Sequence, residues 1–195
     1  MSRKCYRFFG GLLVSQEKWL NKMAERGFRL VRTTKVMYAF EDCVPKQYQY
    51  RVEFVGQKSA QSAEAYASFL RECGYRVFFK NANLNYSVGK AEVRPWADKG
   101  GRLATNATTY NRELLIVEKE RDGKPFELHT TYEDKRAYYA GLRKPWLYLL
   151  AVSVIMGIGM RDIVWGVFAA ISLAAVLLYQ MELGKLKKLS DLQEW

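Results

Sequence analysis

Two long apolar runs near the C-terminus dominate the hydrophobic pattern of the chain. They extend over 146–160 and 163–179, and only Arg161 and Asp162 separate them. A helix needs about 20 apolar residues, and at least about 17, to cross a hydrocarbon core. The second run reaches this limit, and the first reaches it when flanking aromatic and basic side chains occupy the headgroup region. The pattern predicts a two-helix transmembrane hairpin over 145–183, followed by a tail over 184–195.

Basic residues flank both runs, which favours a cytoplasmic location for both ends of the hairpin. We therefore expect a multi-pass protein of the cell membrane with its N-terminus and C-terminus in the cytoplasm. A buried hairpin of a soluble domain is the alternative, but almost no polar residue interrupts either run. The side chains expected at the membrane interface are Arg143, Lys144, Trp146, Tyr148, Trp165, Tyr179, Lys185, Lys187 and Lys188.

The sequence before the hairpin contains an internal repeat. A shift of 47 residues lays segment 17–30 on 64–77 and Gly27 on Gly74. Each copy has an apolar stripe at helical spacing that ends at the glycine, with strand-like sequence before and after it. Ser15 is the expected N-cap of the first helix, and Cys73 lies on the apolar stripe of the second. The order β-α-β-β-α-β predicts a ferredoxin-like α+β sandwich made of split βαβ units.

Alternation of apolar and polar residues supports this order, with strands over 36–41 and over 48–55, the segment before the second helix. The turn-like segment 43–46 between them predicts that they form a hairpin. One face of these strands is expected to pack on the helices and the other to stay in water. Arg7, Arg51 and Glu53 on the wet face are the candidate surface for a ligand or a partner, against the alternative of an ordinary solvated face.

Residues 81–111 are rich in Asn, Gly and Pro and predict turns before a last strand over 112–119. The cytoplasmic α+β domain is therefore expected over 1–128. A capping-box-like start at Thr130 or Thr131 predicts a basic connecting helix over 129–144. Pro145 then suits the first turn of the first membrane helix.

Charge and cysteine content limit the classes of partner and cofactor. The chain has 31 basic and 20 acidic residues, a net charge of +11. All of that surplus lies before residue 145, which suits a domain held against a bilayer with an anionic inner leaflet, or one that meets an acidic partner. The three cysteines and the single His129 match no metal-binding or disulfide pattern, so we expect no metal, no cofactor and reduced thiols.

No pattern of catalytic residues stands out. The phosphate-binding glycine motifs are absent. Cys43, beside an acidic pair, shows no activating cation, and Cys73 lies on the predicted apolar face of a helix, so both are expected to be inert. The RNA-binding motif of a ferredoxin-like platform is absent too, so no nucleic acid is expected. We expect that the protein is not an enzyme. An activity on a lipid or an envelope precursor would require Asp42, Glu53, His129 or Arg51 to converge.

Three blocks of the sequence together resemble the bacterial DUF2812 family of uncharacterised proteins. They read EKWLNKMAERGFRLV, YAFEDCVPKQYQYRVEF and ELHTTYEDKRAYY. The resemblance covers roughly residues 4–140, and the long 81–111 stretch departs from the usual pattern. It implies a cytoplasmic domain of unassigned biochemistry, often followed by membrane helices and often encoded beside PadR-type transcriptional regulators.

Two classes of function follow. The first is a membrane-anchored cytoplasmic sensor or protein-interaction module. It would bind a protein partner and be functionally linked to a transcriptional regulator. The second is a small membrane subunit that assembles with itself as a transport or pore accessory. The second is disfavoured because the apolar runs carry almost no polar residue to line a path.

Overall fold

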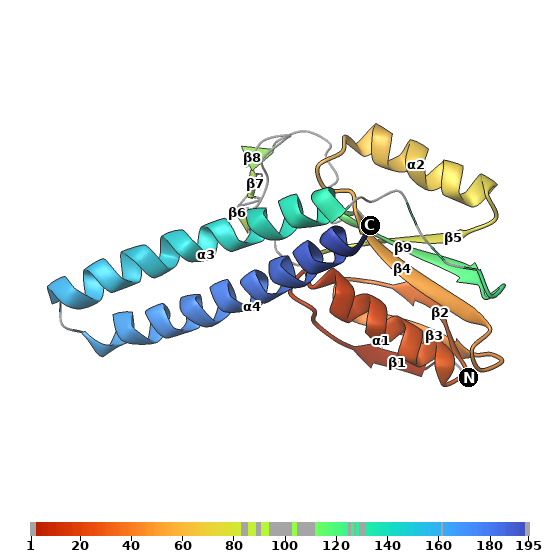
Figure 1. The fold of residues 1–195 in the computed structure, drawn as a ribbon, viewed down its shortest axis with the longest axis horizontal. Coiled ribbons are helices and arrows are strands. Elements are labelled where there is room, and N and C mark those ends of the chain that lie inside the picture. Colours follow the sequence, from red (N-terminus) through yellow and green to blue (C-terminus); the bar gives the residue numbers. More distant parts are fainter. Residues whose placement is uncertain are drawn as a thin grey trace. The chain divides into compact units, whose positions relative to one another are not determined.

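The computed structural model describes residues 3–82, 86–88, 91–93, 103–104, 112–124, 126, 128, 132–160 and 162–193. The chain divides into two compact units. The α+β unit consists of Met1–Arg94 and Lys99–His129, and the helical unit consists of Pro95–Asp98 and Thr130–Trp195. Figure 1 labels their elements.

The first sheet of the α+β unit is built from one contiguous piece of chain. Its elements are β1 (Arg3–Tyr6), α1 (Leu13–Glu25), β2 (Phe28–Thr33) and β3 (Met37–Asp42). The strand order is β1-β3-β2, and β3 is antiparallel to both neighbours. β1 and β2 are therefore parallel, α1 connects them, and β3 lies between them. This is a split βαβ unit.

The second sheet repeats this plan with a strand from much later in the sequence. Its elements are β4 (Tyr48–Phe54), α2 (Ala60–Glu72), β5 (Arg76–Lys80) and β9 (Leu114–Glu120). The order is β4-β9-β5, and Ile116 of the antiparallel β9 is opposite both Val52 and Phe78. Between β5 and β9, short strands β6 (Tyr86–Val88), β7 (Ala91–Val93) and β8 (Leu103–Ala104) form a third antiparallel sheet.

The structure confirms the mixed α+β class, but it does not confirm the ferredoxin-like order. Its strands lie in separate three-stranded sheets instead of one four-stranded sheet. The predicted hairpin between 36–41 and 48–55 is wrong. β3 is the central strand of the first sheet, so β1 and β2 already occupy both of its edges. The 43–46 turn therefore leads from one sheet to the other.

The helix repeat is confirmed, with differences at the helix ends. α1 and α2 have 13 residues each, and Gly27 and Gly74 after them have φ angles of +83° and +86°. Ser15 is not the N-cap of α1, because the helix begins at Leu13 and has no side-chain cap. Cys73 is exposed instead of lying on an apolar face, because α2 ends at Glu72.

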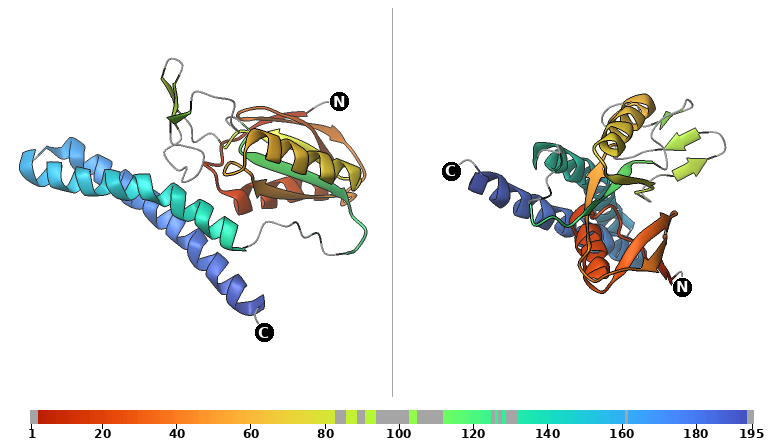
Figure 2. Two further views of the ribbon diagram at one scale, coloured as in Figure 1. Left: turned by 90° about the horizontal axis from the view of Figure 1, so that it is seen from above. Right: turned by 90° about the vertical axis from the view of Figure 1, so that its right-hand side faces the viewer.

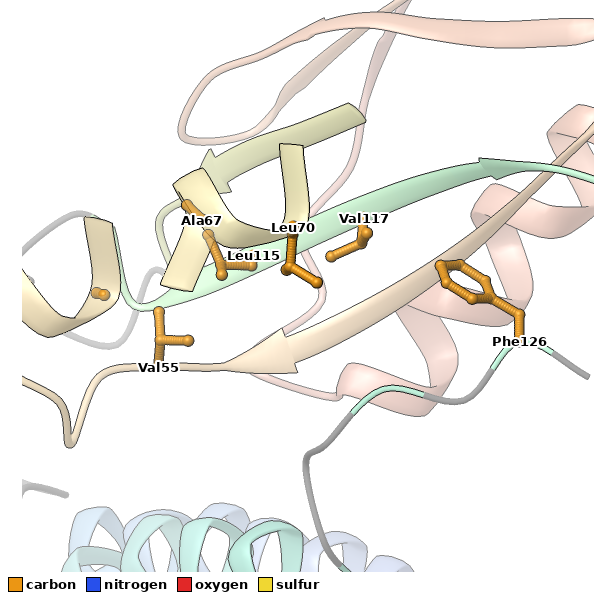
Figure 3. Close-up of a cluster of buried hydrophobic side chains, with 7 residues drawn as sticks. Val55, Ala67, Leu70, Leu115, Val117 and Phe126 are labelled. Carbon is orange, nitrogen blue, oxygen red and sulfur yellow. The ribbon is translucent and has the colours of Figure 1, made fainter. Parts of the chain in front are cut away.

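The second sheet is buried on both faces. On one face, α2 covers the sheet, as Figure 2 shows, and a hydrophobic cluster fills the space between them (Figure 3). On the other face, Tyr50, Val52 and Ile116 are also buried. The prediction of a wet face on β4 is wrong, because α2 covers the face that carries Glu53, which is only 2% exposed. The cluster under α2 comprises Val55, Ala63, Ala67, Leu70, Leu115, Val117 and Phe126.

The helical unit consists of two long helices that pack side by side. They are α3 (Tyr132–Met160) and α4 (Ile163–Gln193) (Figure 1). Segments Lys135–Met160 and Ile163–Leu186 are long and apolar enough to cross a membrane. α3 continues through Pro145, so the predicted connecting helix and first membrane helix are one helix. The predicted 184–195 tail is helical as far as Gln193.

Candidate functional site

The predicted surface residues Arg51 and Glu53 are part of the internal structure of the α+β unit. Arg51 donates a hydrogen bond from Nη1 to Oε1 of Glu17, at 2.5 Å, and one from Nε to the Phe126 carbonyl oxygen, at 2.6 Å. Glu53 is only 2% exposed and accepts a 2.7 Å hydrogen bond from the Tyr66 hydroxyl. Both side chains therefore hold α1 and α2 to the second sheet.

The outer edge of β4 is closed by polar side chains of α1. The Asn21 side chain donates to the Tyr50 carbonyl oxygen and accepts from the Tyr50 N–H, each at 2.9 Å. Glu17 accepts from the Val52 N–H at 3.1 Å. An edge strand normally offers such groups to another chain. Since α1 takes them here, no further strand can pair with this part of β4.

The outer edge of β1 has a different character. Among the described residues, β1 pairs with β3 alone. The 2.8 Å bond from the Arg7 N–H to the Val36 carbonyl marks these two as a hydrogen-bonded pair. In an antiparallel ladder such pairs alternate with non-bonded ones. The N–H and C=O groups of Lys4 and Tyr6 consequently point away from β3, toward the outer edge.

The side chains near this edge are aromatic and basic. Tyr6 is 72% exposed and Phe8 is 62% exposed. The Arg7 guanidinium, predicted at a partner surface, is exposed and lies 5.2 Å from the Phe9 ring centroid and 5.4 Å from that of Trp19. Large exposed aromatic side chains close to an available strand edge are typical of a peptide-binding surface.

A buried polar network links the two sheets. The Tyr50 hydroxyl donates to Oε2 of Glu118 at 2.7 Å and accepts from the Leu30 N–H at 2.8 Å. Arg29 of β2 binds the other oxygen of Glu118. Burial, followed by the Glu118 charge, raises the pKa of Tyr50 above its ordinary value. The hydrogen bonds of this network join β2 to β4 and β9. The network therefore stabilises the fold.

Lys80 forms a second buried polar contact. It is 3% exposed and donates from Nζ to the carbonyl oxygens of Thr34 and Lys35, in the turn between β2 and β3. Its Nζ also lies 5.0 Å from the Tyr38 ring centroid. Burial lowers the pKa of Lys80 to about 8, although the Glu113 charge opposes this shift. Lys80 thereby fastens β5 to the first sheet.

The structure does not bring the enzyme candidates into one site. Asp42 ends β3 in the first sheet, whereas Arg51 and Glu53 lie on β4 in the second. His129 lies outside the described residues. Within the part of the chain that the structure describes, no group of His, Cys, Asp or Glu could hold a metal ion.

The predicted interface residues of the helical unit differ in exposure. Lys144 and Tyr148 are exposed, and Arg143, Trp146 and Trp165 are half-buried; Lys187 and Lys188 lie in α4 with side chains outside the described set. Tyr179 is buried, with its ring centroid 6.5 Å from that of Tyr139, so it packs between the helices. Lys185 pairs with Glu182 at 2.6 Å.

Sequence reasoning missed Glu118, Lys80 and the difference between the edges of β1 and β4. One signal for Glu118 was present, since it shares the strand face of Leu114 and Ile116. The edges depend on which strands pair, and a single sequence does not reveal this.

Comparisons with known proteins give one result. No curated protein and no solved structure matches the chain. The model of a family described as "Protein of unknown function (DUF2812)" matches residues 13–151, from α1 into α3. The chain thus belongs to the DUF2812 family, which agrees with the resemblance of its sequence blocks.

Proposed function

We propose that the protein is a membrane-anchored sensor or protein-interaction module whose β1 edge binds an extended segment of a partner protein. The observation that carries the proposal is the contrast between two of the edge strands, β1 and β4. α1 closes the edge of β4, whereas Lys4 and Tyr6 direct backbone groups outward from β1. Addition of a strand to such an edge is a common mode of peptide recognition.

The chemistry around β1 defines the partner segment. Arg3, Lys4 and Arg7 make the edge basic, and Tyr6 and Phe8 make it aromatic. In a partner segment that alternates acidic and apolar residues, the acidic side chains would pair with the basic side chains of β1. The apolar side chains would pack on Tyr6 and Phe8. A transcriptional regulator is the partner class that we propose. The fold would then be a duplicated relative of the ferredoxin-like sandwich, with one split βαβ unit specialised for binding.

The helical unit supplies the anchor in this proposal. Its apolar side chains, such as Ile155, Ile158 and Ile163, are exposed, as in helices that contact lipid. Basic residues at the ends of α3 and α4 that lie away from the 161–162 turn favour a cytoplasmic position for both termini. The α+β unit would then face the cytoplasm beside the anionic inner leaflet.

The test is crosslinking of the full-length protein in its native membrane, followed by identification of the captured chains. Tyr6→Pro removes an outward N–H, so it should abolish capture without breaking the β1–β3 ladder. Tyr6→Ala, which keeps the N–H, should retain capture at a reduced level. Undiminished capture by Tyr6→Pro would contradict the β1 site. Recovery of the protein itself alone would support the self-assembling membrane subunit instead.

A further inference from the structure

A groove lies in the helical unit, between α3 and α4. It has a volume of about 470 Å³ and is lined by Arg136, Ala137, Ala140, Arg143, Gln180, Leu183 and Gly184. The small side chains of Ala137 and Ala140 and the absence of one at Gly184 leave the space open. Among the residues whose side chains the structure describes, the lining contains two guanidinium groups and no acidic side chain.

The polar groups of the groove are partly engaged with each other. Arg143 Nη1 donates a hydrogen bond to Oε1 of Gln180. This fixes the guanidinium of α3 against α4 and leaves the Gln180 amide N–H groups as donors. Arg143 Nε is buried and has no hydrogen-bond partner among the described residues. The groove therefore contains a positive charge with donor capacity still to be satisfied.

The acidic residue of α4 that is nearest to Gln180 in the sequence already has a lysine partner. Glu182 is buried, and Lys185 pairs with its Oε1 at 2.6 Å. No ion pair of Arg136 or Arg143 occurs within the described part of the chain. The two arginines are seven residues apart on α3, which places them about 10 Å apart along the helix axis. They can therefore contact separate oxygens of one large anionic group.

The groove lies just beyond the apolar part of each helix. Arg143 precedes the apolar run that starts at Trp146, and Gln180 follows the run that ends at Tyr179. In a membrane-spanning hairpin, this position is the level of the lipid headgroups. Basic pockets between membrane helices at this level are suited to phosphate groups of anionic lipids, because Arg forms paired hydrogen bonds with phosphate oxygens.

We infer that this groove binds the headgroup phosphate of an anionic phospholipid. The inference rests on the proposed membrane anchor and adds to it a specific lipid ligand. The guanidinium groups of Arg136 and Arg143 contact separate oxygens of the headgroup, and the Gln180 amide donates a further hydrogen bond. The helical unit would then bind acidic lipid at a defined site between α3 and α4.

The test measures retained lipid by native mass spectrometry of the full-length protein, released from nanodiscs of phosphatidylcholine with phosphatidylglycerol or with cardiolipin. Arg136→Gln, which leaves the Arg143–Gln180 bond intact, and Arg143→Gln should each weaken retention roughly tenfold, as expected for loss of a charged hydrogen bond. Lys144→Gln removes the same charge from an exposed position at the interface, outside the groove, and should weaken retention clearly less than either arginine change.

Three results would overturn the inference. They are equal retention by all variants, an equal loss in Lys144→Gln, and displacement of the lipid by inorganic phosphate, which would indicate a site for a free anion. Failure of the membrane anchor itself has a different signature, because alkaline carbonate would then extract the wild type and every variant from membranes.

Discussion

Arg29 on β2 donates from both Nε and Nη2 to a single carboxylate oxygen of Glu118 on β9, at 2.9 and 2.8 Å. The two residues are 89 positions apart in the sequence and belong to different sheets. Glu118 is 2% exposed, and Tyr50 binds its other oxygen. A buried carboxylate without a cation destabilises the folded state. The packing of the two sheets therefore depends on the ion pair between Arg29 and Glu118.

Replacement of Arg29 by Ala should lower the free energy of unfolding by about 3 kcal/mol, because it leaves the Glu118 charge buried and unpaired. The measurement is urea unfolding of the full-length protein in detergent micelles, followed by tryptophan fluorescence. Arg32→Ala removes an exposed arginine from the same strand and should cost less than about 0.5 kcal/mol. Equal effects of the two changes would show that the buried pair contributes little.

The glycines after the two repeated helices should differ in their tolerance of a side chain. Both have positive φ, which costs an L-residue about 1 kcal/mol. A Cβ at Gly27 would lie 2.8 Å from the Cys43 carbonyl oxygen, whereas one at Gly74 would meet nothing within 4 Å. Gly74→Ala should therefore lower the free energy of unfolding only by the cost of the positive φ angle. Gly27→Ala should lower it by about 1 kcal/mol or more in addition, because of the close contact. Equal losses in thermal unfolding would contradict this contact.

Lys80 should make stability depend on pH in the alkaline range. Its pKa is about 8 in the folded protein, against 10.5 as the ordinary value. The unfolded chain binds more protons between these values, so the free energy of unfolding should rise as pH increases from 8 to 10.5. Relative to Lys80→Met, the wild type should gain up to about 3 kcal/mol over this range.

This difference can be measured by denaturant unfolding in micelles at several pH values. Lys18→Met, which removes an exposed lysine from α1, corrects for the loss of one lysine. If the stability difference between wild type and Lys80→Met is constant with pH, the burial of Lys80 does not control its protonation.

The proposed topology can be tested with thiol labelling, because Cys73 is exposed in the α+β unit. A membrane-impermeant maleimide should label Cys73 only after the cells are made permeable. In Asp162→Cys, the new thiol in the turn between α3 and α4 should react in intact cells. Labelling of Cys73 from outside, or protection of the new thiol, would require a different orientation.

Local features of this chain were predictable and long-range pairing was not. The helices of the two repeat copies, and their ends at Gly27 and Gly74, follow from spacing and backbone conformation within a few residues. The place of β9 between β4 and β5 depends on contacts across the 81–113 segment. Period-two alternation identifies a strand and its buried face, but it does not identify the neighbour of that strand.

In the candidate site, too, local features are predictable from the sequence and long-range contacts are not. Arg7 is recognisable as an exposed cation. The pattern places Arg51 and Glu53 in water, because their contacts with Glu17 of α1 and Tyr66 of α2 depend on the tertiary packing. A polar residue on a strand has the same pattern whether it meets water or a hydroxyl such as that of Tyr66. The open edge of β1 emerges only once the strand order and the Arg7–Val36 bond are known.

The late position of β9 in the sequence has a consequence for synthesis on the ribosome. The first sheet lies within 3–42 and can form as soon as that segment emerges. β4 and β5 must wait for residues 114–120, and until then the inner edges of both strands have no partner. Such unpaired edges are prone to aggregation. The nascent chain therefore passes through a vulnerable interval, which ends just before the first apolar helix leaves the ribosome.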